Sequence, residues 1–400
     1  MNDVDLRIGG TTAASSLPQL SADTAPALAE ASAVCSYTEW DPLEEVIVGT
    51  IGGVTVPPLT HEMKVMVRRD YWDYYRTHAG EPYPEHLVRG AARALDNLQK
   101  VLEGEGVAVT RPDAVDYATQ SFRTPYFEST GFFNADVRDV LLVIGDEIIE
   151  APMALAPRYF EHLKYHALLQ RYFERGCRWT AAPKCSMGRH MYDHDYPEEH
   201  LAFFRGDPNI PDNVGPLVGR YMTNEAEPCF DAADFVRFGR DIIAQRSHVT
   251  NELGIRWLER HLGSAYRVHR ARFRSAGPVH IDTTWVPIGE GRVLSCPTRP
   301  CLSPHILDMF RQARWEVIEA PEGVAPAEFQ LSSRWLSMNI LMLDENRVLV
   351  DKHEGPTIAM FKELGIKPVL VDFKDHYVFG GGLHCATLDV RRRGTLKSYF

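Results

Sequence analysis

The chain has 400 residues, with 43 Lys and Arg against 54 Asp and Glu and a net charge of −11 when His is neutral. Hydrophobic residues make up 44% and aromatic residues 10%, which excludes wholesale disorder. The acidic balance argues against a nucleic-acid or anionic-membrane partner. The densest apolar run, residues 140–144, is the length of a strand and falls well short of the roughly 18–20 residues of a membrane span.

The first 34 residues are rich in Ala, Ser and Thr and contain one basic residue, Arg7, against four acidic ones. They match neither a secretory signal nor a mitochondrial leader, so we expect a flexible tail over 1–35 and a single domain over 36–400. The 7 cysteines are scattered and form no CxxC pair. This pattern predicts free thiols in a reducing compartment, and the N-terminal segment without a leader pattern predicts a cytoplasmic protein.

A strand–turn–strand unit recurs along the chain, and a helical pattern follows several of its copies. The predicted hairpins are 140–144 with 147–150, 234–238 with 241–245, 283–288 with 292–296, and 336–343 with 347–351. The predicted helices are 157–175, 250–262 and 356–364, and the following extended segments are 266–269, 315–318 and 367–371. A fifth unit would pair 43–49 with 388–390, from opposite ends of the chain.

About five such units predict a circular α/β array rather than a doubly wound sheet, with an irregular α/β domain as the alternative. The sequence contains neither GxGxxG nor GxxxxGK[ST], so it offers no phosphate-binding loop.

Chemically reactive side chains lie at or just before the first strand of each unit. If the units surround an axis, these positions converge and gather carboxylates, an imidazole and a thiol in one pocket. They are Asp139, Asp231, His280 with Asp282, Ser332 with Ser333, and Cys385 after the run Gly380-Gly381-Gly382.

This set of groups suits nucleophilic chemistry on a guanidinium. An imidazole assists the ionisation of a thiol, a carboxylate orients the imidazole, and further carboxylates bind a planar cation. Taken singly, each residue has a plainer interpretation. Cys385 and His280 could be packing residues, and Asp231 and Asp234 could cap turns.

At these residues the sequence resembles the arginine:amine amidinotransferases, from about Tyr37 to Phe400. The resemblance is carried by EWDPLEEVIVG at 39–49, FESTG at 127–131, EIIEAPMA at 147–154, EPCFDAADF at 227–235, RDIIAQRSHVTNELGI at 240–255, HID at 280–282, RPC at 299–301, WLSMN at 335–339, and GGGLHC with DVRRRGTL near the end. It implies the pentein fold, a five-fold pseudosymmetric α/β propeller, and a catalytic domain over 36–400.

The resemblance also implies a role for each candidate residue. Cys385 would be the nucleophile, His280 the acid and base, and Asp231 the partner of His280. Asp139 and Asp282 would hold the guanidino nitrogens, and Arg299 and Ser333 the α-carboxylate end of the donor. Gly277 and Val279 stand where glycine-using animal enzymes have the bulkier Asn and Met, so we expect an acceptor amine longer than glycine, such as an ω-amino acid or a specialised-metabolite amine.

The resulting prediction is an enzyme that moves the amidino group of L-arginine to a primary amine through an amidino-cysteine, releases ornithine, needs no cofactor and no metal, and forms a homodimer. The alternatives are an arginine deiminase-like hydrolase that yields citrulline and a non-catalytic arginine-binding protein. We interpret the His190–His200 segment as a surface loop rather than a metal site, and Arg391-Arg392-Arg393 as an ion-paired structural segment.

Overall fold

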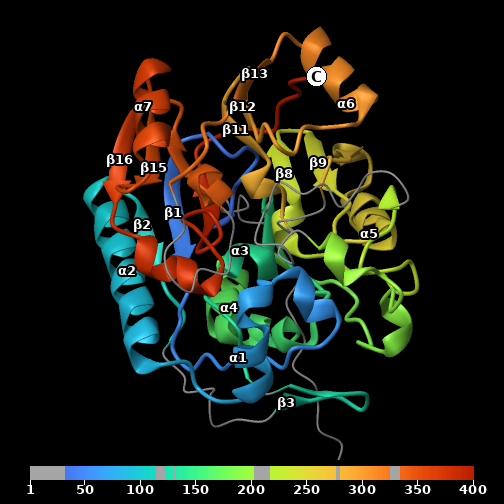
Figure 1. The fold of residues 1–400 in the computed structure, drawn as a ribbon. Coiled ribbons are helices and arrows are strands. Elements are labelled where there is room, and N and C mark those ends of the chain that lie inside the picture. The colour runs from blue at the N-terminus through green and yellow to red at the C-terminus, as the bar shows by residue number, and fades with distance from the viewer. Residues whose placement is uncertain (1–31, 114–121, 130, 202–216, 276–279, 325–333) are drawn as a thin grey trace, which may run out of the picture. The chain divides into compact units, whose positions relative to one another are not determined.

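The computed structural model describes residues 32–113, 122–129, 131–201, 217–275, 280–324 and 334–400. Those from Ser32 onward form one compact unit. Ala33 and Val34 are buried, and Cys35 bridges to Arg391, so the packed chain begins before the predicted boundary at residue 36. The mixed α/β class is confirmed, and the strands are joined into small sheets (Figure 1).

Five three-stranded sheets in the described residues share one topology. In each, an antiparallel pair is extended by a third strand that runs parallel to the middle one. The sheets are β5 (Leu141–Ile144), β6 (Glu147–Glu150) and β7 (Arg178–Ala181); β8 (Phe235–Phe238), β9 (Asp241–Gln245) and β10 (Arg267–Ala271); β11 (Trp285–Gly289), β12 (Arg292–Ser295) and β13 (Glu316–Glu319); β14 (Leu341–Asp344), β15 (Arg347–Asp351) and β16 (Lys367–Val371); and β17 (Thr387–Arg392), β1 (Leu43–Val48) and β2 (Ala108–Thr110).

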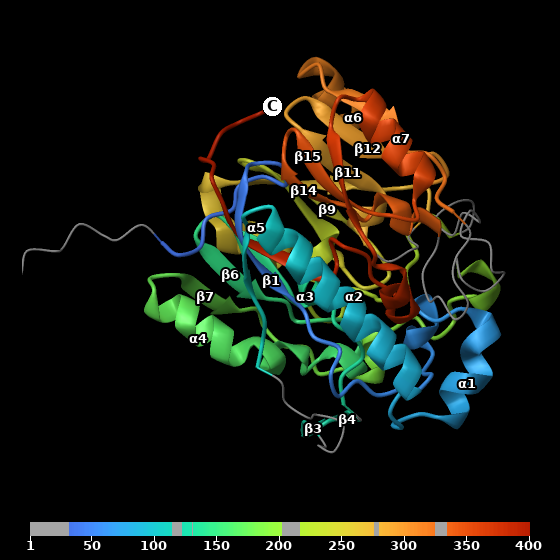
Figure 2. The ribbon, with the colours of Figure 1, turned by 90° about the vertical axis from the view of Figure 1, so that its left-hand side faces the viewer.

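The crossover between the second and third strands of every sheet contains a helix that packs beside the sheet, as parallel pairing of those strands requires. These helices are α4 (His166–Glu174), α5 (Glu252–Leu262), α6 (Pro304–Gln312), α7 (Gly355–Glu363) and α2 (Glu85–Gly104). They lie on the outside of the sheets, as Figure 2 shows for α2 and α4. Outside the repeat are α1 (Trp72–Thr77), α3 (Val137–Val140) and the small hairpin of β3 (Phe122–Arg123) and β4 (Glu128–Ser129).

The predicted hairpins are confirmed, including the fifth, which joins β1 near the start of the described chain to β17 near its end. Gly145 and Gly239 form two of the hairpin turns with φ of 62° and 66°, a region that favours glycine. The Arg391–Arg393 segment is ion-paired as predicted: Arg391 contacts Glu44, and Arg392 contacts Asp389.

Two predicted elements are wrong in part. The predicted helix over 157–175 is broken into two 3₁₀ turns, Ala156–Arg158 and Glu161–Tyr165, before α4 begins. Glu161 lies in the second turn, buried, and accepts hydrogen bonds from the backbone of Phe133 and Asn134, so tertiary contacts replace regular helix there. The second is the predicted strand 336–343, whose N-terminal part lies in a 3₁₀ turn, Arg334–Met338. The helices α2 and α6 were not predicted from the sequence.

The first strand of each sheet is preceded by a short turn that carries polar side chains into the interior. These turns are α3 before β5, Ala232–Asp234 before β8, Ile281–Thr283 before β11, Arg334–Met338 before β14, and the Gly380–Cys385 segment before β17. Four of these turns form a chain of contacts in space. The helix α3 contacts Ala232–Asp234, the turn Ala232–Asp234 contacts Ile281–Thr283, and the turn Ile281–Thr283 contacts Arg334–Met338. The shared topology therefore brings residues distant in sequence to one place.

Candidate active site

Cys385 lies at the end of the glycine-rich segment, just before β17, and its side chain is buried. Its sulfur is 3.1 Å from Asn339 Nδ2 and 3.4 Å from Asp282 Oδ2. The backbone N–H of Cys385 and that of His384 both donate to Asn339 Oδ1, at 3.0 and 2.9 Å. Since Oδ1 accepts these two bonds, the amide nitrogen of Asn339 must face the sulfur, where it can donate to a thiolate.

The two glycines before this cysteine are required by close contacts. A Cβ on Gly381 would lie 2.0 Å from Asp136 Oδ1, and one on Gly382 would lie 2.6 Å from Asn339 Oδ1. Any side chain at either position would push the segment that carries Cys385 away from the groups that surround it.

His280 and Asp231 lie side by side, as the sequence predicts for a catalytic pair. His280 Nε2 is 3.1 Å from Asp231 Oδ2, and Nδ1 is 3.4 Å from Asp139 Oδ1. Burial alone would lower the pKa of His280, but the carboxylates of Asp139 and Asp231 outweigh it and raise the pKa to about 10. At neutral pH the ring is an imidazolium and can donate a proton.

Asp139 and Asp282, the predicted guanidinium holders, each use one carboxylate oxygen within the protein. Asp139 Oδ2 pairs with Arg158 Nη1 at 2.5 Å, and Asp282 Oδ2 pairs with His384 Nδ1 at 2.9 Å. The other oxygen, Oδ1 in both, is buried and accepts no hydrogen bond among the described residues, although Asp139 Oδ1 lies within 3.4 Å of His280 Nδ1. Two such acceptors near a buried thiol suit a planar donor such as a guanidinium.

The same carboxylates control the ionisation of Cys385. Burial raises the pKa of the Cys385 thiol well above its ordinary value, and the negative charges of Asp282, Asp139 and Asp136 raise it further. Without substrate the sulfur therefore stays protonated at neutral pH. A cation placed between Asp139 and Asp282 would cancel part of that negative field and favour the thiolate.

Arg299, the predicted ligand of the donor carboxylate, is fully buried after β12. Its Nη2 donates to the backbone carbonyl of Thr283, the residue that follows Asp282. Arg299 therefore lies next to the turn that carries Asp282. Ser333, Gly277 and Val279 lie outside the described residues.

Comparison with known proteins places the chain among enzymes of one type. It is 48% identical over 370 residues to "Glycine amidinotransferase, mitochondrial" of Xenopus laevis, a match that covers 92% of this chain and 85% of that protein. It is 42% identical to the L-arginine:L-lysine amidinotransferase of Pseudomonas savastanoi pv. phaseolicola, over 92% of this chain and 97% of that one. The chain belongs to the amidinotransferase family. No family model matches it.

Solved structures agree with this assignment. An amidinotransferase of the saxitoxin biosynthetic pathway from Microseira wollei superposes with a TM-score of 0.79 and 42% identity, over 92% of this chain and 99% of that one. A dimethylarginine dimethylaminohydrolase superposes with a TM-score of 0.52 at 14% identity, over 86% of this chain and 99% of that one, which is a likeness of fold alone. The amidinotransferase chain thus has the pentein type of α/β fold.

Three residues of the amidinotransferase site were not predicted from sequence. Asn339 lies in the WLSMN motif, and His384 directly precedes Cys385, so the sequence motifs could have predicted both as site residues. Arg158 had no such signal. It is fully buried, and besides Asp139 it pairs with Glu161 at 2.9 Å. Its ion pair with Asp139 Oδ2 fixes the position of the Asp139 carboxylate.

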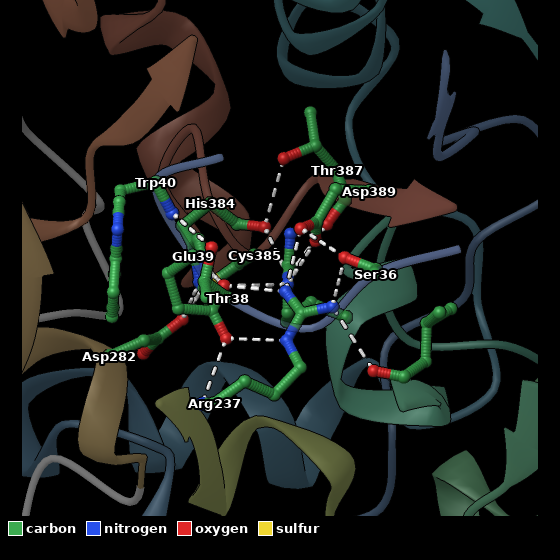
Figure 3. A network of polar contacts seen from close by, with 12 residues as sticks. Ser36, Thr38, Glu39, Trp40, Arg237, Asp282, His384, Cys385, Thr387 and Asp389 are labelled. Atoms are coloured by element: carbon green, nitrogen blue, oxygen red, sulfur yellow. Dashed lines mark hydrogen bonds and ion pairs between the residues drawn. The ribbon is translucent and has the colours of Figure 1, made fainter. Parts of the chain in front are cut away.

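A second buried polar network lies next to the amidinotransferase site (Figure 3). Arg237 is its centre and contacts Glu39 and Asp389, each at 2.6 Å. Arg138 pairs with Asp389 at 2.6 Å and also donates to the backbone carbonyl of Thr387. This network fixes the start of β17 and hence the segment that carries Cys385.

Two further features of the described residues bear on partners. No helix there combines the length and apolar character needed to span a bilayer. No group of three or more His, Cys, Asp or Glu side chains in the same parts of the chain is arranged to hold a metal ion. His190, from the segment interpreted as a surface loop, is exposed and pairs with Glu227 at 2.7 Å.

Proposed function

We propose that this chain transfers the amidino group of L-arginine to a primary amine through a covalent amidino intermediate on Cys385. The observation that carries the proposal is the buried thiol of Cys385 beside two carboxylates, Asp139 and Asp282, that each keep one oxygen without a hydrogen bond among the described residues. The membership in the amidinotransferase family and the names of its relatives support arginine as the donor.

In the first half-reaction the arginine guanidinium donates hydrogen bonds to the Oδ1 atoms of Asp139 and Asp282. Its positive charge favours loss of the thiol proton of Cys385 to solvent, and the thiolate attacks the guanidino carbon. The His280 imidazolium then protonates the departing δ-nitrogen as the C–N bond breaks. Ornithine leaves, and the amidino group remains bonded to sulfur with His280 neutral.

In the second half-reaction an acceptor amine enters where ornithine has left. Its nitrogen attacks the amidino carbon, His280 takes the proton that the amine loses, and the C–S bond breaks to regenerate the thiolate. Asp231 stabilises the imidazolium in both halves through its bond to Nε2. The burial of Cys385 helps to keep water from the intermediate, since hydrolysis of the amidino-cysteine would release urea and waste the amidino group.

We propose an acceptor longer than glycine. Gly277 and Val279 are smaller than the Asn and Met expected of glycine-using animal enzymes, and one methylene in a pocket is worth about 1–3 kcal/mol. The named relatives use different acceptors, lysine in the Pseudomonas enzyme and glycine in the Xenopus enzyme, so family membership leaves the choice open. Glycine and 4-aminobutyrate, supplied together at equal concentration, test this proposal, and a clear preference for glycine would refute it.

We further propose that the five sheets close into a five-fold propeller and that the protein is a homodimer. Closure is supported by contacts between neighbouring units: β17 touches β5, and β1 of the same sheet touches β14 on its other side. Light scattering tests the dimer. The cytoplasmic location stays a prediction, and the mitochondrial name of the Xenopus laevis relative argues against it.

The reaction class is tested by incubating the protein with arginine and a panel of primary amines. The proposal expects equal amounts of ornithine and of a guanidino product that is heavier than the supplied amine by one amidino group. Citrulline and ammonia would indicate the deiminase-like hydrolase. Arginine binding without any product would indicate a binding protein. Cys385→Ala serves as the control that removes only the nucleophile.

A further inference from the structure

The imidazole of His384 lies between two carboxylates. Its Nδ1 is 2.9 Å from Asp282 Oδ2, and its Nε2 is 3.5 Å from Glu39 Oε2 (Figure 3). A carboxylate can only accept hydrogen bonds, so a short contact to Nδ1 requires a proton on that nitrogen. The ring therefore donates to Asp282 and faces a second acid at its other end.

Glu39 is a fixed anchor. It is buried, and Arg237 reaches it with two nitrogens, Nε to Oε1 at 2.8 Å and Nη2 to Oε2 at 2.6 Å. Burial alone would raise the pKa of Glu39, but the guanidinium of Arg237 outweighs it and holds the pKa below its usual range. The carboxylate that faces His384 is thus ionised and held in place.

Asp282 is the other end of this chain of contacts. Its Oδ2 faces both His384 and the sulfur of Cys385, whereas Oδ1 has no hydrogen-bond partner among the described residues. The bond from His384 fixes the rotation of the carboxylate and so leaves Oδ1 free for a substrate nitrogen. It also counteracts the burial that would raise the pKa of Asp282, and the net shift is downward.

We propose that His384 is a positioning residue for amidino transfer, which orients the Asp282 carboxylate toward the guanidinium and links it to the Glu39–Arg237 pair. This inference rests on the proposed function, because it assigns Asp282 to the donor guanidinium. Hydrogen bonds rather than tight packing hold the ring, since Glu39, Asp282 and His384 line a cavity of about 10 Å³, roughly the space of one water.

Two amide substitutions separate the two bonds of the ring. The side-chain nitrogen of Asn falls near the Nδ1 position of His, and that of Gln falls near Nε2. His384→Asn therefore keeps a donor toward Asp282 and loses the contact with Glu39. His384→Gln keeps the donor toward Glu39 and loses the one toward Asp282. An Ala variant is less informative, because it would enlarge the cavity.

The first measurement is kcat/KM for arginine across pH. We expect His384→Gln to lose ten- to a hundredfold, the usual effect of one hydrogen bond to a charged group, and His384→Asn to retain most of the activity. The acidic limb of the profile should move to higher pH in His384→Gln alone, because Asp282 loses the donor that keeps its carboxylate ionised. The other titratable groups that face Asp282, His280 and Cys385, are the same in both variants.

The second measurement is arginine binding by calorimetry in the Cys385→Ser background, where no turnover occurs. We expect His384→Gln to weaken binding at least tenfold more than His384→Asn. Equal losses in both variants, or a greater loss in His384→Asn, would overturn the inference in either measurement. A wild-type protein that binds arginine but makes no guanidino product would instead overturn the proposed function, and the binding comparison would still decide the role of His384.

Discussion

Replacing Asp282 with Asn should change the reactivity of Cys385 and the activity of the enzyme in opposite directions. The carboxylate oxygen Oδ2 lies 3.4 Å from the sulfur, and its charge helps to keep the pKa of the thiol above its ordinary value. At an effective dielectric constant of about 20, two unit charges at that distance repel by roughly 5 kcal/mol. Since about 1.4 kcal/mol is tenfold, even a quarter of this repulsion would change the thiolate population about tenfold.

Without the carboxylate the thiolate becomes more abundant, while the guanidinium loses one of its two acceptors. We therefore expect iodoacetamide to alkylate Cys385 at least tenfold faster at pH 7 in Asp282→Asn, and kcat/KM for arginine to fall ten- to a hundredfold. Asp308→Asn, on the exposed face of α6, is the matched control for loss of a carboxylate and should change neither rate. Alkylation that is unchanged or slower in Asp282→Asn would refute the electrostatic account of this thiol.

Three further outcomes follow from the same geometry. Cys385→Ser should abolish transfer and leave the fold intact, and the wild type should show parallel lines in two-substrate kinetics, whereas intersecting lines would argue against a covalent intermediate. Gly381→Ala should remove activity, because its Cβ would meet Asp136 Oδ1 at 2.0 Å, and wild-type turnover would disprove this packing. The pKa of His280 is raised from 6.5 to about 10 in the folded protein, so the stability that its charge contributes should be fully present below pH 6.5. The free energy of unfolding, measured with urea, should fall by a few kcal/mol as the pH rises from 6.5 to 10. A pH profile no different from that of His280→Gln would contradict the raised pKa of His280.

The hairpins could be predicted because their signals are local. Buried apolar runs flank turns such as Gly145-Asp146, and each run needs only its neighbour to form the pair. The positions of Asp139, His280 and Cys385 at the starts of the units could be predicted for the same reason. Once the units had been recognised as equivalent, their polar ends were expected to lie together. The helix α2 could also have been found, since Ala91, Leu95, Leu98 and Leu102 repeat at helical spacing on its buried face.

The groups that hold the site in place depend on contacts between distant residues, which a single sequence does not reveal. Asn339 contacts Cys385 across 46 positions, and Arg158 reaches Asp139 across 19. A buried arginine such as Arg158 looks in sequence like any surface residue, because only its folded partners justify its burial. The broken helix over 157–175 has the same origin. Glu161 binds the backbone of Phe133 and the side chain of Arg158, and these tertiary contacts replace a regular helix.

The central claim is that Cys385 carries the amidino group between the two half-reactions. The most direct test is to mix the enzyme with arginine in the absence of any acceptor amine, quench the mixture with acid, and measure the masses of the intact protein and of its peptides. The account predicts a mass increase of one amidino group on the peptide that contains Cys385, one equivalent of ornithine released, and no such increase in Cys385→Ser. Unmodified enzyme that forms product only when arginine and amine are present together, or an amidino group on any other residue, would contradict it.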